Sequence, residues 1–181
     1  MLPVMDVSRW QGRINWDKVK ASGLVSGVML KTVSTNRKLS KRKDGLYIDP
    51  TFERNYAECK RLGIPVGVYY YTYATDKEMA DAELALLKTA LTGKTFELPI
   101  SVDVEDNKIK KLSTQALTDL AAYALATIEL GMDMETFNRD GVETVAYGAQ
   151  PRSQPGARFD WRSPRHLGFE LLVDLGDLLA D

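Results

Sequence analysis

The chain has 181 residues, 44% of them apolar and 27% charged, with a formal net charge of −1. This balance is typical of one globular domain with a buried core, and it argues against a nucleic-acid binder or a polybasic membrane anchor. With one cysteine, Cys59, and one histidine, His166, an internal disulfide is excluded, and neither a zinc site nor a Cys–His catalytic pair is expected. No apolar run reaches the roughly 18 residues of a membrane-spanning helix, and the N-terminus has no signal-peptide pattern.

The first elements predicted are a strand, a short helix and a second strand. Residues 4–8 and 25–32 predict buried strands. Between them, Asn15 is a suitable N-cap for a helix over residues 16–22, which Gly23 ends.

Residues 34–48 predict a polar, solvated loop. It contains a basic segment, Arg-Lys-Leu-Ser-Lys-Arg-Lys at positions 37–43. Attraction of an anionic polymer is the functional alternative to simple solvation of these charges.

A second helix is expected to open with Asp49 as the N-cap and Pro50 at the first position, and to end at Gly63. Its apolar face comprises Phe52, Tyr56 and Cys59. Residues 64–71 then predict a third strand, rich in β-formers throughout, as expected of a strand covered on both faces.

A third helix follows, because the residues from Thr75 to Glu78 fit a capping box with Thr75 as the N-cap. It is expected to end near Gly93 and to bury a stripe formed by Met79, Ala82, Leu86 and Ala90. After a fourth strand at residues 98–105, Ser113 caps a last helix that ends at Gly131. The predicted buried face of that helix comprises Leu117, Leu120, Ala121, Ala124 and Ile128.

The fourth strand ends in two acids, Asp103 and Glu105. Their i, i+2 spacing puts both side chains on the same face, with Cα atoms roughly 6.6 Å apart. Two carboxylates in one pocket are the minimum needed to cleave a glycosidic bond. The alternative is a strand that runs into a solvated acidic turn without any chemistry.

The repeated strand–helix order predicts an α/β fold with a parallel sheet and right-handed crossovers, as a barrel or an open sheet. In both forms the C-terminal ends of the strands share one edge, where α/β proteins place their chemistry. The residues near these ends are Asp6, Lys31, Tyr69 or Tyr71, Asp103 and Glu105. Three acids from two strands are therefore expected to converge on one cleft.

Five segments carry a family resemblance. They are residues 6–16 (DVSRWQGRINW), 29–31 (MLK), 49–56 (DPTFERNY), 63–71 (GIPVGVYYY) and 102–105 (VDVE). In this order they resemble glycoside hydrolase family 25, the lysozymes (N-acetylmuramidases) of phages, bacteria and some fungi, and the last matches the family's Asp-x-Glu signature. The resemblance covers about residues 4–130.

The resemblance implies an irregular (β/α) TIM-like barrel that hydrolyses the β-1,4 bond between N-acetylmuramic acid and N-acetylglucosamine in peptidoglycan. Glu105 would be the general acid, with a pKa raised by a neighbouring carboxylate. Asp103 would stay charged, and would either stabilise the transition state or orient the N-acetyl group of the substrate. Asp6 would be the third active-site acid.

The resemblance also implies the binding residues and the setting. Trp10, Lys31, Tyr69 and Tyr71 would bind substrate, with the aromatic rings stacking on sugars. Of Tyr69 and Tyr71, only one is expected to face the cleft. No cofactor or metal is expected. The expected partner is bacterial cell-wall peptidoglycan, met by a monomer outside the cell or in the wall, with no nucleic acid and no membrane.

Two departures from the family pattern matter. No acid follows Lys31, so Thr32 or Ser34 would have to replace a cleft carboxylate as hydrogen-bonding groups. The resemblance also ends near residue 129, which divides the chain into a family region, 1–131, and a divergent tail, 132–181. The tail has no lysine and predicts a strand at 142–147, a loop at 150–164 and a helix at 169–179.

The tail is too short for the remaining units of a barrel, so we expect a barrel that is incomplete at its C-terminal end, from truncation or a shifted reading frame. Two alternatives to an active lysozyme follow. One is an inactive fragment or a carbohydrate-binding pseudoenzyme of the same family. The other is a divalent-metal enzyme that uses Asp6, Asp103 and Glu105 as oxygen ligands.

Overall fold

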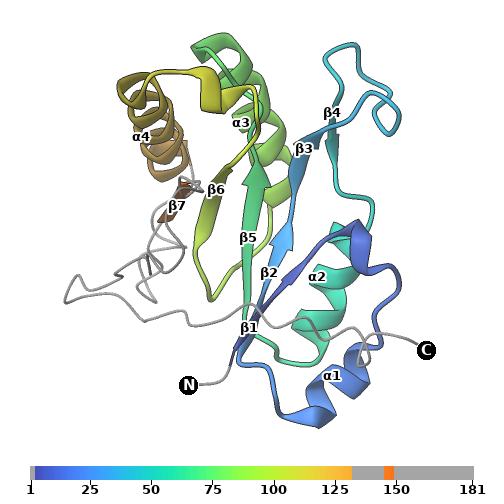
Figure 1. The fold of residues 1–181 in the computed structure, drawn as a ribbon. Coiled ribbons are helices and arrows are strands. Elements are labelled where there is room, and N and C mark those ends of the chain that lie inside the picture. Colours follow the sequence, from blue (N-terminus) through green and yellow to red (C-terminus); the bar gives the residue numbers. More distant parts are fainter. Residues whose placement is uncertain (1–2, 132–144, 149–181) are drawn as a thin grey trace, which may run out of the picture.

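The computed structural model describes residues 3–131 and 145–148 (Figure 1). Within these residues seven strands are formed: β1 (Val4–Val7), β2 (Gly27–Lys31), β3 (Val33–Thr35), β4 (Leu46–Ile48), β5 (Val66–Tyr71), β6 (Ile100–Val104) and β7 (Val145–Gly148). The helices are α1 (Trp16–Ser22), α2 (Phe52–Arg61), α3 (Lys77–Leu91) and α4 (Thr114–Gly131), with short 3-10 turns at Arg9–Gln11 and Ile109–Lys111.

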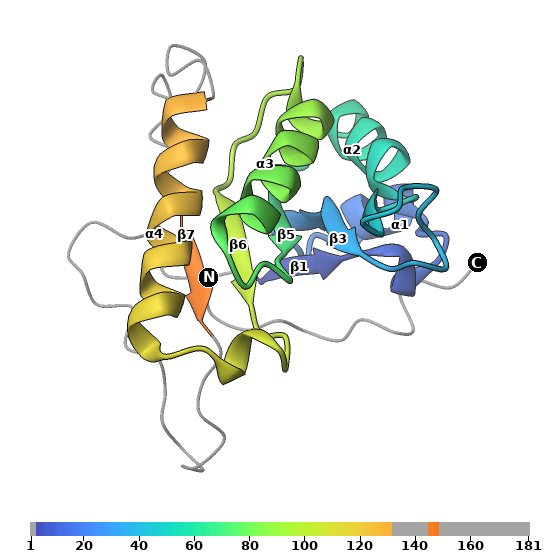
Figure 2. The same cartoon turned by 90° about the horizontal axis from the view of Figure 1, so that it is seen from above.

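The main sheet has five strands in the order β1-β2-β5-β6-β7, and every neighbouring pair is parallel. This confirms the predicted α/β class with a parallel sheet. Within the described residues, β1 and β7 each pair with one neighbour, so this part of the sheet is open. Figure 2 shows α1, α2 and α3 along one side of the sheet, with α4 beside β6 and β7.

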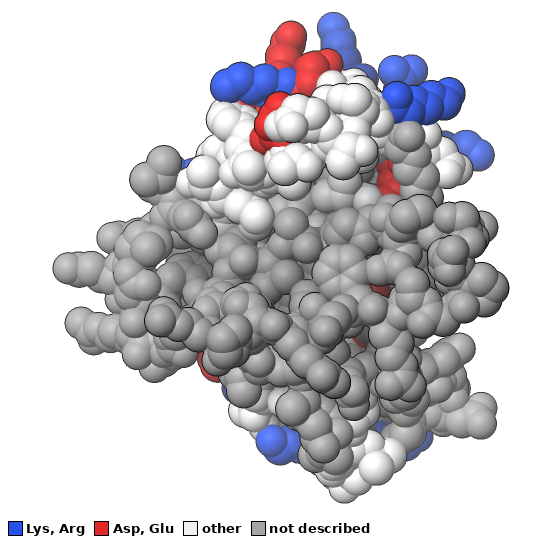
Figure 3. All heavy atoms as spheres, turned by 60° about the vertical axis from the view of Figure 1, so that its left-hand side comes forward, with Lys and Arg blue, Asp and Glu red and all other residues white. Residues whose placement is uncertain are grey.

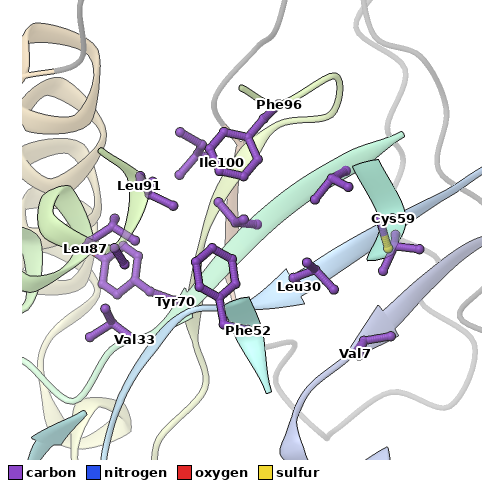
Figure 4. Packing of buried hydrophobic residues seen from close by; sticks show 14 of the residues in the cluster. Val7, Leu30, Val33, Phe52, Cys59, Tyr70, Leu87, Leu91, Phe96 and Ile100 are labelled. Atoms are coloured by element: carbon purple, nitrogen blue, oxygen red, sulfur yellow. The ribbon is translucent and has the colours of Figure 1, made fainter. Parts of the chain in front are cut away.

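The two faces of the sheet differ because side chains alternate along a strand. One face belongs to the apolar core, which also contains residues of all four helices. Its strand members are Met5, Val7, Val28, Leu30, Val66, Val68, Tyr70, Ile100 and Val102. Figure 4 shows strand residues of this set packed with α2 and α3. Each fully buried aliphatic side chain contributes about 1.5–3 kcal/mol. The other face carries the alternate residues, including the predicted site.

Helix ends follow local chemistry, with two corrections. Asn15 caps α1 by accepting from the Lys18 N–H, as predicted. The N-cap of α2 is Thr51 rather than Asp49, although the Asp49 carboxylate accepts from the Thr51 N–H and hydroxyl just before the helix. The N-cap of α3 is Asp76 rather than Thr75, because the Asp76 side chain accepts from the Met79 N–H.

The predicted buried stripe of α3 is wrong in part. Ala90 is buried as predicted, but Met79 is exposed and Ala82 and Leu86 are only partly buried. The other buried residues of the helix are Ala80, Glu83, Leu84, Leu87 and Leu91. For α4, Ser113 accepts from the Ala116 N–H as predicted. Of the predicted face, Ala124 and Ile128 are buried, while Leu117, Leu120 and Ala121 are only partly buried.

The segment 34–48, predicted as loop, contains a hairpin. Strands β3 and β4 pair antiparallel, with Val33 opposite Ile48 and Thr35 opposite Leu46. Val33 and Leu46 belong to the core, which explains why these short ends are ordered as strands. Only the stretch between the strands is a loop.

In the tail, residues 145–148 form β7, which pairs with β6 and agrees with part of the predicted strand at 142–147. The rest of that strand, the predicted loop at 150–164 and the predicted helix at 169–179 lie outside the described residues. Among the helices described, none combines the length and apolar character needed to cross a membrane.

Candidate active site

The predicted site residues lie at one edge and on one face of the sheet. Lys31 pairs with Tyr69 across β2 and β5, and Tyr71 pairs with Asp103 across β5 and β6. Asp6 lies in β1, one residue before the end of that strand. Paired residues of neighbouring strands share a face, so the sheet brings these side chains together.

Asp6 and Tyr69 are linked by a hydrogen bond in which the tyrosine hydroxyl donates to the carboxylate. Loss of solvation raises the pKa of Asp6, and the charge of Glu105 adds to this effect. The Tyr69 hydrogen bond and the Lys31 charge oppose it. Burial and the facing carboxylates together raise the pKa of Tyr69, so its hydroxyl stays protonated and remains a donor.

Lys31 is the cation at the centre of the site. Four carboxylates act on its charge, in the order Asp103, Asp49, Asp6 and Glu105. Its Nζ atom lies 4.6 Å from the ring centroid of Tyr71 and 5.8 Å from that of Tyr69, within reach of a cation–π interaction. Burial lowers the pKa of Lys31, and the carboxylates partly restore it. Lys31 therefore balances part of the negative charge of the site.

Asp103 is half-buried in β6, and burial together with the charge of Glu105 raises its pKa to about 7. The expectation was that Asp103 stays charged while Glu105 holds the proton. The free structure instead favours the neutral form of Asp103 below about pH 7, because fewer water molecules solvate its charge. Glu105 lies just beyond β6 and is exposed to solvent.

Both Tyr69 and Tyr71 lie on the site face, so the expectation that only one of them faces it is wrong. Residues i and i+2 of a strand share a face, and the intervening Tyr70 is buried in the core. Tyr71 also packs against Tyr73, with ring centroids 5.0 Å apart. The site therefore has an aromatic side formed by β5 and the turn after it.

Trp10 stands at the edge of the site on the 3-10 turn after β1. It is 73% exposed, and the Arg9 guanidinium lies 3.8 Å from its ring centroid. The turn is held by Ser8 at its start and by Asp49, whose carboxylate accepts from the Arg9 N–H at 2.9 Å. An exposed indole on a fixed turn is available to stack on a ligand.

Sequence reasoning missed Asp49 as part of the site. The residue is buried, and its charge acts on both Lys31 and Tyr69. Its Asp-Pro context predicted a helix cap, and nothing in the local sequence signals a contact with a turn 40 residues earlier.

A second missed residue is Glu83 of α3, which is 2% exposed. Its carboxylate accepts from the Thr72 hydroxyl at 2.6 Å and from the Tyr73 N–H at 2.8 Å. The Thr72 N–H in turn donates to the Asp103 carbonyl at 3.0 Å. Glu83 thus fixes the turn that joins the aromatic side of the site to the strand of Asp103. A charged residue inside a helix pattern predicts a solvated face, so sequence alone does not reveal this role.

The expected substitutes for the missing acid are engaged elsewhere. The buried Thr32 hydroxyl donates to the Tyr69 carbonyl at 2.7 Å, and Ser34 is hydrogen-bonded to Tyr73. Across the residues that the structure describes, no group of three or more histidine, cysteine or acidic side chains is arranged to hold a metal ion.

Comparison with known proteins supports the resemblance. The sequence model of "Glycosyl hydrolases family 25" matches residues 5–149, a region that continues past Gly131 and includes β7. "Lysozyme M1" of Streptomyces globisporus is 36% identical over 67 residues, which are 37% of this chain and 19% of that protein. The chain thus spans only a small part of this relative.

Two solved structures share the fold. The bacterial lysozyme of Streptomyces coelicolor matches with a TM-score of 0.60 and 25% identity, over 81% of this chain and 62% of that one. The modular autolysin LytC of Streptococcus pneumoniae, solved in complex with a synthetic peptidoglycan ligand, matches with a TM-score of 0.59 and 26% identity, over 71% of this chain and 30% of that one. On the family match across most of its length, the chain belongs to glycosyl hydrolase family 25.

Proposed function

We propose that this chain is a peptidoglycan muramidase that hydrolyses the β-1,4 bond between N-acetylmuramic acid and N-acetylglucosamine. The observation that carries the proposal is the convergence of Asp6, Asp103 and Glu105 around Lys31 at the C-terminal edge of the sheet. The lysozyme relatives and the peptidoglycan ligand of LytC support this substrate class.

In the proposed mechanism Glu105 is the general acid. Its exposed position beyond β6 leaves the carboxyl accessible to the glycosidic oxygen of a bound chain. Glu105 gives its proton to this oxygen as the bond to the anomeric carbon breaks. Asp103 and Asp6, as carboxylates, stabilise the positive charge that develops on the sugar ring. Asp103 does so either directly or by orienting the N-acetyl group that attacks the anomeric carbon, and water then completes the hydrolysis.

The raised pKa of Asp103 makes the proposed mechanism dependent on pH. The carboxylate must be ionised to stabilise positive charge, and below about pH 7 the free protein holds a proton on it. We therefore expect kcat/KM to fall as the pH drops below about 7. Lys31 supports ionisation of Asp103, and Trp10, Tyr69 and Tyr71 provide the surfaces for sugar rings.

The test is lysis of purified peptidoglycan, measured as loss of turbidity, together with cosedimentation of the protein with the same material. Glu105→Gln should abolish lysis and leave binding unchanged, because the amide cannot donate a proton. Glu78→Gln, an exposed substitution on α3, is the matched control and should behave as the unmodified chain.

The outcomes separate the alternatives. Unchanged lysis in Glu105→Gln would remove Glu105 from the mechanism. Binding without lysis in the unmodified chain would identify a carbohydrate-binding pseudoenzyme. Loss of lysis on addition of a chelator would favour the divalent-metal enzyme.

A further inference from the structure

The stretch between β3 and β4, residues 36–45, concentrates positive charge. It contains Arg37, Lys38, Lys41, Arg42 and Lys43 against one acid, Asp44, in a chain whose net charge is −1. All six side chains are exposed. We call residues 36–45 the basic hairpin loop.

Most of this charge is unneutralised. Among the described residues, the ion pairs of the loop join only Arg42 to Asp44. Arg37, Lys38, Lys41 and Lys43 therefore present four cations to solvent. Cations that only serve solubility are usually interspersed with acids of opposite sign, whereas the one acid of this loop, Asp44, is already paired with Arg42.

The loop is held in one shape by its own hydrogen bonds. At its base the Asn36 N–H donates to the Gly45 carbonyl, and the Gly45 N–H donates to the Arg42 carbonyl. The Asn36 carbonyl accepts from the N–H groups of Leu39 and Ser40, and its side-chain oxygen accepts from the Lys38 N–H. The Asp44 carboxylate accepts from the Leu46 N–H as well as from Arg42. A fixed backbone lowers the entropy cost of binding, so the spacing of the cations is largely set before a ligand arrives.

The loop stands at the same edge of the sheet as the acids. Only one residue separates its first strand, β3, from the end of β2, which carries Lys31. The hairpin is anchored by Ser34, which is hydrogen-bonded to Tyr73 beside Tyr71. Figure 1 shows the hairpin projecting past the ends of β2 and β5. In Figure 3, basic side chains gather at the same upper end of the molecule, with a few acidic ones among them.

We propose that the basic hairpin loop binds an anionic phosphodiester polymer carried by the cell-wall glycan, and so holds the chain on its substrate. This rests on the proposed muramidase function. Four exposed cations suit a repeated single negative charge, as in a polyol-phosphate chain. The acids at Asp6, Asp103 and Glu105 repel such a polymer from the site itself and leave the loop as its contact.

Two observations favour this occupant over other anions. The loop has no aromatic residue, so it cannot stack on the bases of a single-stranded nucleic acid. The carboxylates of a peptide stem are attached to the sugar that lies in the site, whereas the loop points away from the sheet edge (Figure 1). A polymer that leaves the glycan can reach the loop while a sugar occupies the site.

The test compares Lys41→Gln/Lys43→Gln with the unmodified loop, both in a Glu105→Gln background so that walls are not digested. Cosedimentation is measured with intact Gram-positive walls and with the same walls after hydrofluoric acid has removed phosphodiester polymers. We expect roughly tenfold weaker binding to intact walls at low salt. The magnitude of the slope of log K against log salt should fall by about 1.4, taking about 0.7 per lost phosphate contact as for single-stranded nucleic acids.

Lys18→Gln/Lys88→Gln is the matched control, because it removes two exposed lysines from α1 and α3 and changes the net charge equally. It should bind both wall preparations as the unmodified loop does. Circular dichroism of each variant verifies the fold.

Three results would overturn the inference. One is an equal loss of binding to intact and stripped walls, which would assign the loop to the glycan or its peptides. Another is an equal loss in the control pair, which would make the effect one of net charge. The third concerns two soluble probes, a single-stranded oligonucleotide and poly(glycerol phosphate): the loop substitutions would weaken binding of the oligonucleotide more than binding of the poly(glycerol phosphate). A separate outcome bears on the proposed muramidase function. If neither the unmodified loop nor any variant bound the stripped walls, that function would be contradicted, while the comparison of loop variants on intact walls would still test the loop.

Discussion

Replacement of Glu83 tests how the turn after β5 is held. In Glu83→Ala the Thr72 hydroxyl and the Tyr73 N–H lose their acceptor, while the Ala74 N–H keeps the Thr72 Oγ1 atom at 3.1 Å. A buried donor without a partner costs about 1–3 kcal/mol. Relief of the buried carboxylate, whose pKa burial raises, offsets part of this cost. We expect a loss of about 3 kcal/mol in the free energy of unfolding.

The assay is chemical denaturation at pH 7, followed by tryptophan fluorescence and analysed with a common m-value. Glu83→Gln keeps one acceptor oxygen and should lose roughly 1–2 kcal/mol. Glu78→Ala, on the exposed first turn of the same helix, is the control for helix propensity and should change stability by less than about 1 kcal/mol.

A Glu83→Ala protein within about 0.5 kcal/mol of the unmodified chain, at an unchanged m-value, would refute this reasoning. It would mean that water or another group satisfies the two donors. A loss equal to that of Glu78→Ala would have the same meaning, because a buried and an exposed carboxylate would then be equivalent.

Three further outcomes can be measured by the same unfolding experiment. Gly67→Ala should lower the free energy of unfolding by about 1–3 kcal/mol, because the added Cβ would lie 2.5 Å from Met29 Sδ and 2.7 Å from a backbone oxygen. A denaturation midpoint equal to that of the unmodified chain would contradict this and show that β5 can shift to make room. Asp76→Ala should lower the free energy of unfolding by about 1 kcal/mol, because the Met79 N–H loses its capping acceptor, whereas Asp76→Asn should retain most of the stability. Equal losses in the Ala and Asn variants would contradict the capping role. The folded-state pKa of Asp103, about 7, exceeds its ordinary 3.8, so its contribution is fully present below about pH 4 and is lost as the pH rises to about 7. Asp103→Asn should remove up to about 1.4 kcal/mol per pH unit of this decline, and an unchanged pH slope would show that the group ionises normally in the fold.

The apolar periodicity and the glycine and asparagine signals were enough to predict the β/α order, because these features act within a few residues. The helix α1 was predicted to the residue, with Asn15 and Gly23 at its ends. Errors at α2 and α3 shifted a cap by one or two residues, since Asp, Thr and Pro in succession offer several acceptors and packing selects one. The hairpin β3–β4 was missed because its strands are only three residues long, and Val33 and Leu46 become strand residues by joining the core.

The sequence by itself determined the chemistry available at the site. The sequence already contains the i, i+2 acids Asp103 and Glu105, the early acid Asp6 and the family order of motifs. Only the tertiary structure decided the state of these groups, because a pKa depends on what surrounds the charge. Burial raises the pKa of Asp103, and packing brought Asp49 and Glu83 from distant segments to hold the turns around the site.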